Sequence, residues 1–207
     1  SEATEAGRFD AEKFSVSIPQ RKSDPVEFTT DEGIRSGMTA ESIAKMRPAF
    51  KKDGSVTAAN ASSINDGAAA LVVMSEEMAA DLELAPLARV TAYATGGCAP
   101  EWVMMAPEHS IKRCAGMLNM EPSDFDLHEI NEAFSAAAIA LTRTLALDSD
   151  RVNVNGGAVA LGHPIGASGA RVLVTLLHAM QQRDAHTGMA SLCLGGGNAV
   201  SLAVERI

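Results

Sequence analysis

The stretch that decides the fold runs from Asn153 to Arg171 and has the sequence NVNGGAVALGHPIGASGAR. Its glycines are crowded around His163, where they permit positive φ angles and close backbone approach. The stretch leads into a predicted helix over 169–182, whose first N–H groups can bind an anion. It lacks both the Gly-Lys-Ser/Thr ending of a P-loop and the glycine spacing of a dinucleotide-binding fingerprint. A histidine fixed in such a loop is a candidate acid–base residue, although a lone histidine is more often structural.

Around this loop, predicted strands and helices alternate. Apolar runs bounded by glycine or serine predict strands, the first of them buried, and Ser75 followed by two glutamates predicts a helix start. The chain ends in two adjacent strands separated by glycines, which favours a layered α/β domain with a mixed sheet. The predicted strands are 68–74, 87–95, 125–130, 189–194 and 199–204, and the predicted helices are 76–84, 107–118, 134–147 and 169–182.

Residues 1–65 differ from the rest of the chain because they are polar and irregular. A short strand is predicted at 15–19 and a short helix at 39–46. Thr39 is only a weak cap for that helix, since a capping box normally has Glu or Gln where this chain has Ser42. On composition alone, the region is a surface lobe or a linker.

The composition excludes several classes of protein. Apolar residues make up 46% of the 207 residues, enough for a sizeable core. The net charge of −9 argues against nucleic acid as a partner, but leaves room for an anionic cofactor at a local basic site. The longest apolar run is too short for a membrane span, and the polar, acidic start does not resemble a signal peptide. We therefore expect a soluble, cytoplasmic protein that binds neither membrane nor nucleic acid.

The three cysteines are too few and too irregularly spaced for a disulfide scaffold or a zinc site, so no metal is expected. Cys193 is the most suggestive of them, because a predicted strand delivers it into Gly195-Gly196-Gly197, where free N–H groups lie beside the thiol. The alternative is a buried structural cysteine before a hairpin.

A further polar position is Asn131, in the sequence Asn-Glu-Ala-Phe between a predicted strand and a predicted helix. Its simplest interpretation is a helix N-cap. Taken together, however, Asn131, His163 and Cys193 all lie at strand ends or in adjoining loops, where sites gather in layered α/β folds. A carboxamide, an imidazole and a thiol can perform acid–base or nucleophilic chemistry.

At this point the sequence resembles the thiolases, and the resemblance spans essentially the whole chain. It implies a thiolase-like C-terminal half over 66–207, a layered mixed sheet with helices on both faces, and part of an irregular coenzyme A-binding loop domain over 1–65. The matching stretches are NEAF at 131–134, the glycine-rich stretch at 153–171, CLGGGNAV at 193–200, GRFDAE at 7–12, RPAFKKDGSVTAANASSINDGAAA at 47–70 and VER at 204–206.

The resemblance also implies an activity, namely reversible Claisen condensation of acyl-CoA with acetyl-CoA, or thiolysis of a 3-ketoacyl-CoA. By motif position, Cys193 is then the acid–base cysteine. His163 activates the nucleophile and donates to the thioester oxygen, and Asn131 holds a water in that oxyanion hole. The N–H of Gly195 stabilises the oxyanion of the acyl-enzyme. Such donors matter because an α-proton is weakly acidic, and a thiolate base requires a lowered pKa.

For coenzyme A, the resemblance implies a binding surface in the first lobe instead of a linker. Arg35 suits the nucleotide end, by stacking or by charge. The implied binding positions are Arg35, Ser42, Phe50, Ala58 and Ser62, with Phe50, Ala133 and Phe134 lining the pantetheine tunnel.

The nucleophilic cysteine of the family belongs to a first half that these residues do not include, and neither Cys98 nor Cys114 has a matching context. Our hypothesis is a split thiolase, in which a separate subunit supplies that half and two pairs form an α2β2 heterotetramer. Two alternatives remain open. The chain is a non-catalytic acyl-CoA-binding protein, or it uses Cys193, His163 and Asn131 as a cysteine hydrolase.

Overall fold

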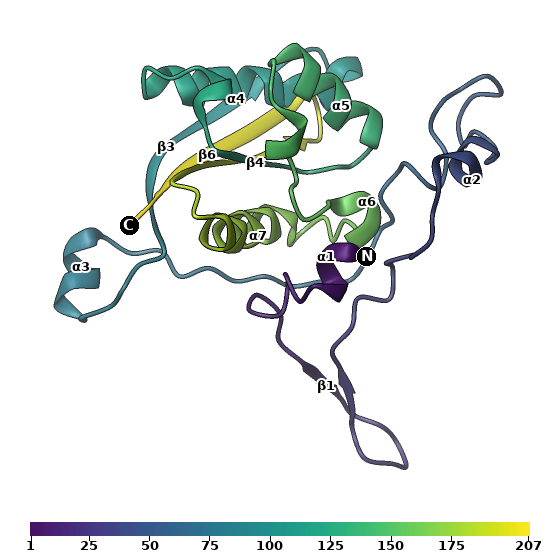
Figure 1. The fold of residues 1–207 in the computed structure, drawn as a ribbon, viewed down its shortest axis with the longest axis horizontal. Helices are drawn as coiled ribbons and strands as arrows, with labels where there is room; N and C mark the ends of the chain where they lie inside the picture. The colour runs from purple at the N-terminus through teal and green to yellow at the C-terminus, as the bar shows by residue number, and fades with distance from the viewer.

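A four-stranded mixed sheet forms the centre of the computed structural model, which describes residues 1–207 (Figure 1). Its strand order is β3-β6-β5-β4, and only β4 and β5 run parallel. The predicted mixed sheet is therefore confirmed. The strands are β3 (Ala88–Gly97), β4 (Leu127–Ile130), β5 (Thr187–Leu194) and β6 (Asn198–Arg206).

Helices cover both faces of this sheet. The helices α4 (Ala106–Met117) and α5 (Ser135–Thr144) lie on one face, and α7 (Ser168–Arg183) lies on the other (Figure 1). Each face has its own apolar core, with Ile111, Phe125 and Met189 in the first. The second core is formed by α7 with β4, β5 and β6. β4 lies between the two cores and is buried at all four of its residues, two of which, His128 and Glu129, are polar.

The predicted buried strand over 68–74 is wrong. This segment is extended and pairs with no strand, and Val72 and Val73 are 85% and 78% exposed. In Figure 1 it runs past α7 toward α3 (Glu76–Asp81), which projects from the body. The apolar pattern predicts a buried strand, but burial of a strand requires a neighbouring strand to pair with, and no strand of this chain pairs with 68–74. The helix start at Ser75 is confirmed, since its Oγ accepts from Met78 N at 3.1 Å.

Residues 1–65 form two arms and a short N-terminal helix, α1 (Glu2–Glu5). The first arm is a hairpin of β1 (Val16–Ile18) and β2 (Val26–Phe28), and the second carries α2 (Ala40–Ala44). The cap of α2 is stronger than predicted. Thr39 Oγ1 accepts from Ser42 N, and Ser42 Oγ accepts in return from Thr39 N. A serine thus performs the role usually given to glutamate.

The remaining helical elements are short. They are α6 (Ala158–Leu161) and three 3₁₀ turns at Pro100–Met105, Pro122–Asp124 and Ser149–Arg151.

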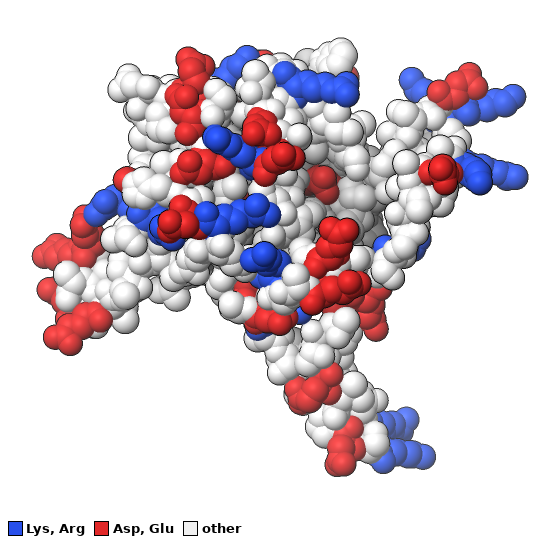
Figure 2. Space-filling model, in the orientation of Figure 1, with Lys and Arg blue, Asp and Glu red and all other residues white.

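Basic side chains lie on both arms, next to acidic ones, as well as on the body of this acidic chain (Figure 2). The arm that carries α2 includes Lys45, Arg47, Lys51 and Lys52. Such a local basic surface suits an anionic ligand. No helix of the structure is long and apolar enough to cross a membrane.

Candidate active site

The loop between α6 and α7 holds His163 through its backbone. The N–H of His163 donates to Ser63 O at 3.0 Å and also approaches Asn65 Oδ1 at 3.3 Å. Gly162 has a φ of +95°, and a Cβ there would collide with the Asn65 side chain. The glycine is therefore required both by its backbone conformation and by the close passage of the segment 63–65.

Both ring nitrogens of His163 are engaged. Nδ1 lies 2.5 Å from Ser168 Oγ, and Nε2 lies 3.3 Å from Asn131 Nδ2. The Ser168 hydroxyl donates its hydrogen to Pro164 O at 3.0 Å, so toward the ring it accepts. The network therefore assigns the hydrogen to Nδ1 and leaves Nε2 as an acceptor for the Asn131 amide. Burial, with the charge of Arg171 second, lowers the pKa of His163, so the ring is a neutral base at neutral pH.

Asn131 lies beside His163 and is not a helix cap. Its N–H donates to Ser191 O at 2.9 Å, as a continuation of β4, whereas α5 begins at Ser135 with Phe134 in the N-cap position. The simple helix-cap interpretation is therefore wrong. Asn131 is 6% exposed, and its buried Oδ1 accepts no hydrogen bond within the chain. Since buried amide oxygens are normally paired, this atom is an acceptor available to a donor from outside the chain.

Asn153 fixes the end of β4 just before Asn131. Its Oδ1 accepts from Ile130 N at 2.7 Å, and its Nδ2 donates to Ile130 O at 2.9 Å. Asn153 itself has a φ of +50°, a conformation that asparagine tolerates better than most residues. Neither Asn153 nor Ser168 is predicted as a site residue from the sequence, because both act through contacts that no local pattern specifies.

Cys193 lies on β5, two residues after Ser191 and on the same side of the strand. The thiol is half-buried, and burial raises its pKa. The lowered pKa that a thiolate base requires is not found in the chain as described. His163 bonds to Asn131 and Ser168 and makes no hydrogen bond to Cys193 Sγ. The resting group is thus a protonated thiol.

The glycine turn after Cys193 has the predicted place between β5 and β6. Gly197 has a φ of +88°, its carbonyl accepts from Cys98 N at 2.8 Å, and a Cβ there would collide with Cys98 O. Gly195 at the start of the turn is exposed, with open space where a Cβ would point. The other two thiols are structural, since Cys114 is fully buried and Cys98 Sγ donates a hydrogen bond to Trp102 O.

Four of the predicted coenzyme A positions come together in the structure. Ser62 donates to Ala133 O from both its N–H and its Oγ, at 3.0 and 3.1 Å. The Phe50 and Phe134 rings meet edge to face with centroids 6.2 Å apart. The other three lie on the arm, where Arg35 and Ala58 are exposed and the Ser42 hydroxyl caps α2. Their roles stay predictions.

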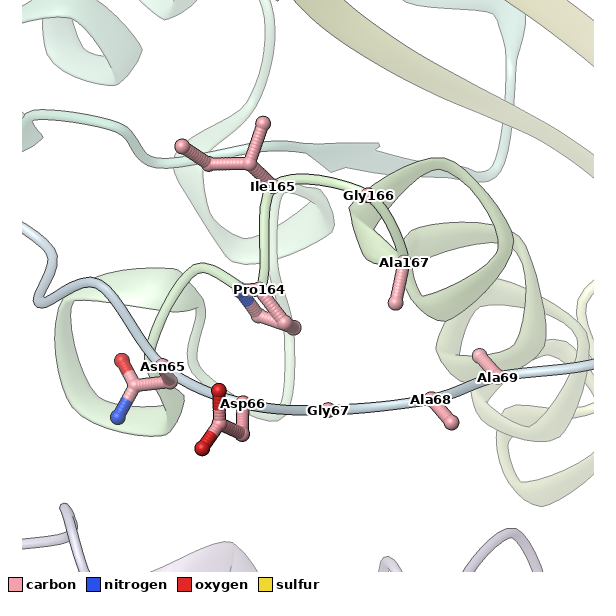
Figure 3. Close-up of a pocket in the computed structure, with 9 residues that line it drawn as sticks. All are labelled: Asn65, Asp66, Gly67, Ala68, Ala69, Pro164, Ile165, Gly166 and Ala167. Atoms are coloured by element: carbon pink, nitrogen blue, oxygen red, sulfur yellow. The ribbon is translucent and has the colours of Figure 1, made fainter.

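A cavity of about 520 Å³ lies beside the histidine loop (Figure 3). One wall is the extended segment 65–69 and the other is the turn 164–167. In Figure 3 Ile165 points away from the extended segment, whereas Pro164 lies over it, and a Cβ at Gly67 would stand 2.8 Å from the proline ring. The described residues contain no cluster of three or more His, Cys, Asp or Glu side chains that could hold a metal.

Comparison with known proteins matches this chain to one family along nearly all of its length. The family model described as "Thiolase, C-terminal domain" matches residues 84–206, and "Thiolase, N-terminal domain" matches residues 1–77. Acetyl-CoA acetyltransferase of Cupriavidus necator is 56% identical over 204 residues, which are 99% of this chain and 52% of that protein. A probable acetyl-CoA acyltransferase of Staphylococcus epidermidis is 53% identical over 100% of this chain and 52% of its own length.

Solved structures agree. The crystal structure of the Bacillus anthracis acetyl-CoA acetyltransferase superposes with a TM-score of 0.96 at 46% identity, covering 100% of this chain and 52% of that one. The crystal structure of human mitochondrial 3-ketoacyl-CoA thiolase in complex with CoA superposes with a TM-score of 0.89 at 34% identity, covering 100% of this chain and 51% of that one. The chain thus spans about half the length of the curated relatives it matches. By sequence and by fold, it belongs to the thiolase family.

Proposed function

We propose that this chain supplies the acid–base part of a thiolase active site, which forms or cleaves a carbon–carbon bond beside a coenzyme A thioester. The observation that carries the proposal is the neutral His163, whose Nε2 faces Asn131 while Nδ1 is held by Ser168. An imidazole fixed in this tautomer can accept one proton at Nε2 and then donate it.

In the proposed condensation, His163 Nε2 accepts the proton of the nucleophilic thiol on the first half of the enzyme. That thiolate attacks the acyl-CoA thioester and the C–S bond to coenzyme A breaks. The leaving coenzyme A thiolate takes the proton of Cys193, so coenzyme A departs as a thiol and Cys193 becomes a thiolate. The imidazolium Nε2–H then donates to the thioester oxygen of acetyl-CoA. Because this oxygen gains negative charge as the α-proton leaves, a preorganised donor there lowers the barrier to enolate formation.

Cys193 is the proposed base for that α-proton. Its thiolate takes the proton, the enolate carbon attacks the acyl-enzyme, the new C–C bond forms, and the acyl C–S bond breaks to release the nucleophilic thiolate. Burial favours the neutral thiol. A charged His163 or substrate donors in the assembled site must therefore favour the thiolate. Asn131, whose Oδ1 is free to accept, is proposed to hold a water that donates to the thioester oxygen beside His163. The N–H of Gly195 is the proposed donor to the oxyanion of the acyl-enzyme.

Coenzyme A is proposed to bind against the first lobe. The cluster of Phe50, Phe134, Ala133 and Ser62 gives the pantetheine arm an apolar wall next to the site. The exposed Arg35 and the basic arm around Ser42 and Ala58 suit the anionic nucleotide end (Figure 2). We keep residues 1–65 as the loop-domain part and 66–207 as the C-terminal part of this proposal.

The first half is proposed to lie on a separate subunit, in an α2β2 assembly. The support is the apolar segment 68–74, which is extended and unpaired. Its Val72 and Val73 are exposed to solvent. Burying each side chain against another subunit would contribute roughly 1.5–3 kcal/mol of hydrophobic free energy. Native mass spectrometry of the protein from its source cells tests this. A complex with a second chain bearing one acylated cysteine supports the split enzyme, whereas a single chain of about twice the mass overturns it.

The activity is tested by thiolysis of acetoacetyl-CoA with coenzyme A in the isolated complex. Wild type should turn over, Cys193→Ala should lose activity by at least about 10³-fold, and both should bind coenzyme A. Binding without turnover in wild type would instead identify an acyl-CoA-binding protein. A cysteine hydrolase is disfavoured, because its thiol needs a hydrogen-bonded base and Cys193 has none here.

A further inference from the structure

A buried charged contact lies close to the site and is not used by the proposed mechanism. Arg171 Nη1 donates to Glu129 Oε1 at 3.2 Å, and the two side chains are only 17% and 2% exposed. A buried carboxyl group beside a guanidinium is weak evidence for stability, because its burial offsets most of their attraction and raises the pKa of Glu129 to about 8. We therefore expect a role in the site, and not stability, to explain why this contact lies here.

The contact closes a ring of five residues, one of which is the candidate base, His163. Glu129 lies on β4, two residues before Asn131. Arg171 lies on α7, three residues after Ser168, which holds His163 Nδ1. The ring closes where Asn131 Nδ2 meets His163 Nε2 at 3.3 Å. Every link is a hydrogen bond or a short piece of backbone, so the Arg171–Glu129 contact is connected from both sides to the amide of Asn131 and the imidazole of His163.

We propose that Arg171 is a positioning residue, which fixes the end of β4 against the start of α7 through Glu129 and thereby sets Asn131 against His163. Arg171 itself does not touch the imidazole. A guanidinium suits this task because its planar fork bonds several acceptors in fixed directions, which a lysine ammonium does not. The kinetic part of this inference rests on the proposed function, whereas the geometric part does not.

Further contacts connect Arg171 to the N-terminal segment of the chain. Arg171 Nη1 also approaches Thr175 Oγ1 at 3.5 Å, and Thr175 Oγ1 donates to Glu12 Oε1 at 3.3 Å. Three carboxyl groups belong to this cluster, those of Glu12, Glu129 and Glu132, and burial raises the pKa of each. Asp31 and Lys13 also act on Glu12 by charge, in opposite directions. Arg171 is the cation that opposes all three shifts, so it is the central member of the cluster.

The test is ¹⁵N NMR of the His163 ring in the 207-residue chain, with three variants. Arg171→Lys keeps the charge and loses the fork, Arg171→Met loses both, and Arg183→Met is the control, since Arg183 lies on the same helix and only bonds Val154 O. We expect wild type and the control to show the Nδ1–H tautomer. Arg171→Lys should shift the ring toward a mixture of tautomers, and Arg171→Met should also raise its titration midpoint.

An unchanged tautomer in Arg171→Lys overturns the proposal, even if Arg171→Met moves the midpoint, because Arg171 would then act by charge alone. If Arg171→Met does not fold, the tautomer of His163 in Arg171→Lys alone decides whether the proposal stands. In the active complex, Arg171→Lys should lower kcat about 10-fold with KM within about twofold, and an unchanged kcat contradicts positioning. If the wild-type complex has no thiolase activity, the proposed function fails while the NMR result still decides the geometry.

Discussion

Replacing Ser168 by alanine is the most direct test of the histidine network. Ser168 is 1% exposed, and its hydroxyl accepts from His163 Nδ1 and donates to Pro164 O. The substitution leaves a buried Nδ1–H without a partner, so the ring loses the contact that selects its tautomer. We expect a fraction of the imidazole to carry its hydrogen on Nε2, where it can no longer accept a proton.

The size of the effect follows from the burial of the group. An unsatisfied buried donor costs about 1–3 kcal/mol. If this places the Nδ1–H tautomer about 1–2 kcal/mol above the other one, it is about 5- to 30-fold less populated than that tautomer, and kcat should fall by about the same factor. KM should change less than about twofold, because Ser168 lies behind the ring and away from the Nε2 side. The free energy of unfolding should fall by roughly 1 kcal/mol.

Thr142→Ala is the matched control. Thr142 Oγ1 donates to Ala138 O, four residues earlier at 2.8 Å, as Ser168 Oγ does to Pro164 O, but it lies on α5 and touches no candidate site residue. Steady-state thiolysis of the assembled enzyme and ¹⁵N shifts of His163 are the two measurements. A kcat for Ser168→Ala equal to that of Thr142→Ala, with an unchanged tautomer, would refute the assignment of Nδ1–H.

Three further predictions concern stability. Burial raises the pKa of Glu129 to about 8, so folding takes up a proton between about pH 5 and pH 8. The free energy of unfolding should therefore fall as pH rises through this range, by at most about 1.4 kcal/mol per pH unit. Glu129→Gln should flatten this slope, measured by urea unfolding at pH 5.5, 6.5 and 7.5, and an unchanged slope contradicts the prediction. Ser201 Oγ lies 2.8 Å from both Ser110 Oγ and Ser191 Oγ in the core, so Ser201→Ala should cost about 1–3 kcal/mol by denaturant unfolding, and a neutral result means that the chain of hydroxyls is not needed. Gly162→Ala should lower stability by about 1–3 kcal/mol because of its positive φ and the clash with Asn65, whereas an unchanged melting temperature would show that the loop relaxes freely.

The glycine-rich loop and the strands around it could be predicted from sequence because each is specified locally. Glycine marks unusual backbone at Gly162 and Gly197, and apolar runs bounded by turns mark β5 and β6. The placement of His163 after such a loop already indicated an oriented ring. These features depend on neighbours in the chain, so local pattern was enough.

The supporting residues could not be predicted because their roles depend on contacts distant in sequence. Asn153 clamps Ile130 across 23 positions, and Arg171 reaches Glu129 across 42. The direction of the Cys193 pKa shift was missed for the same reason, since burial depends on what surrounds the thiol. The segment 68–74 failed differently, because an apolar pattern predicts a strand but not the partner that covers it.

One segment connects the proposed assembly to the chemistry. Ser63 O and Asn65 Oδ1 accept the backbone N–H of His163, and only a few residues later the same extended segment becomes the exposed apolar run 68–74. Gly67 lies against Pro164, which leaves the segment little room to move independently of the histidine loop. In the proposed enzyme, a first half that pairs with 68–74 therefore also tightens the backbone that orients His163. Docking of the half that carries the nucleophile and alignment of the base that activates it are then one event, because both are carried by the same extended stretch of backbone.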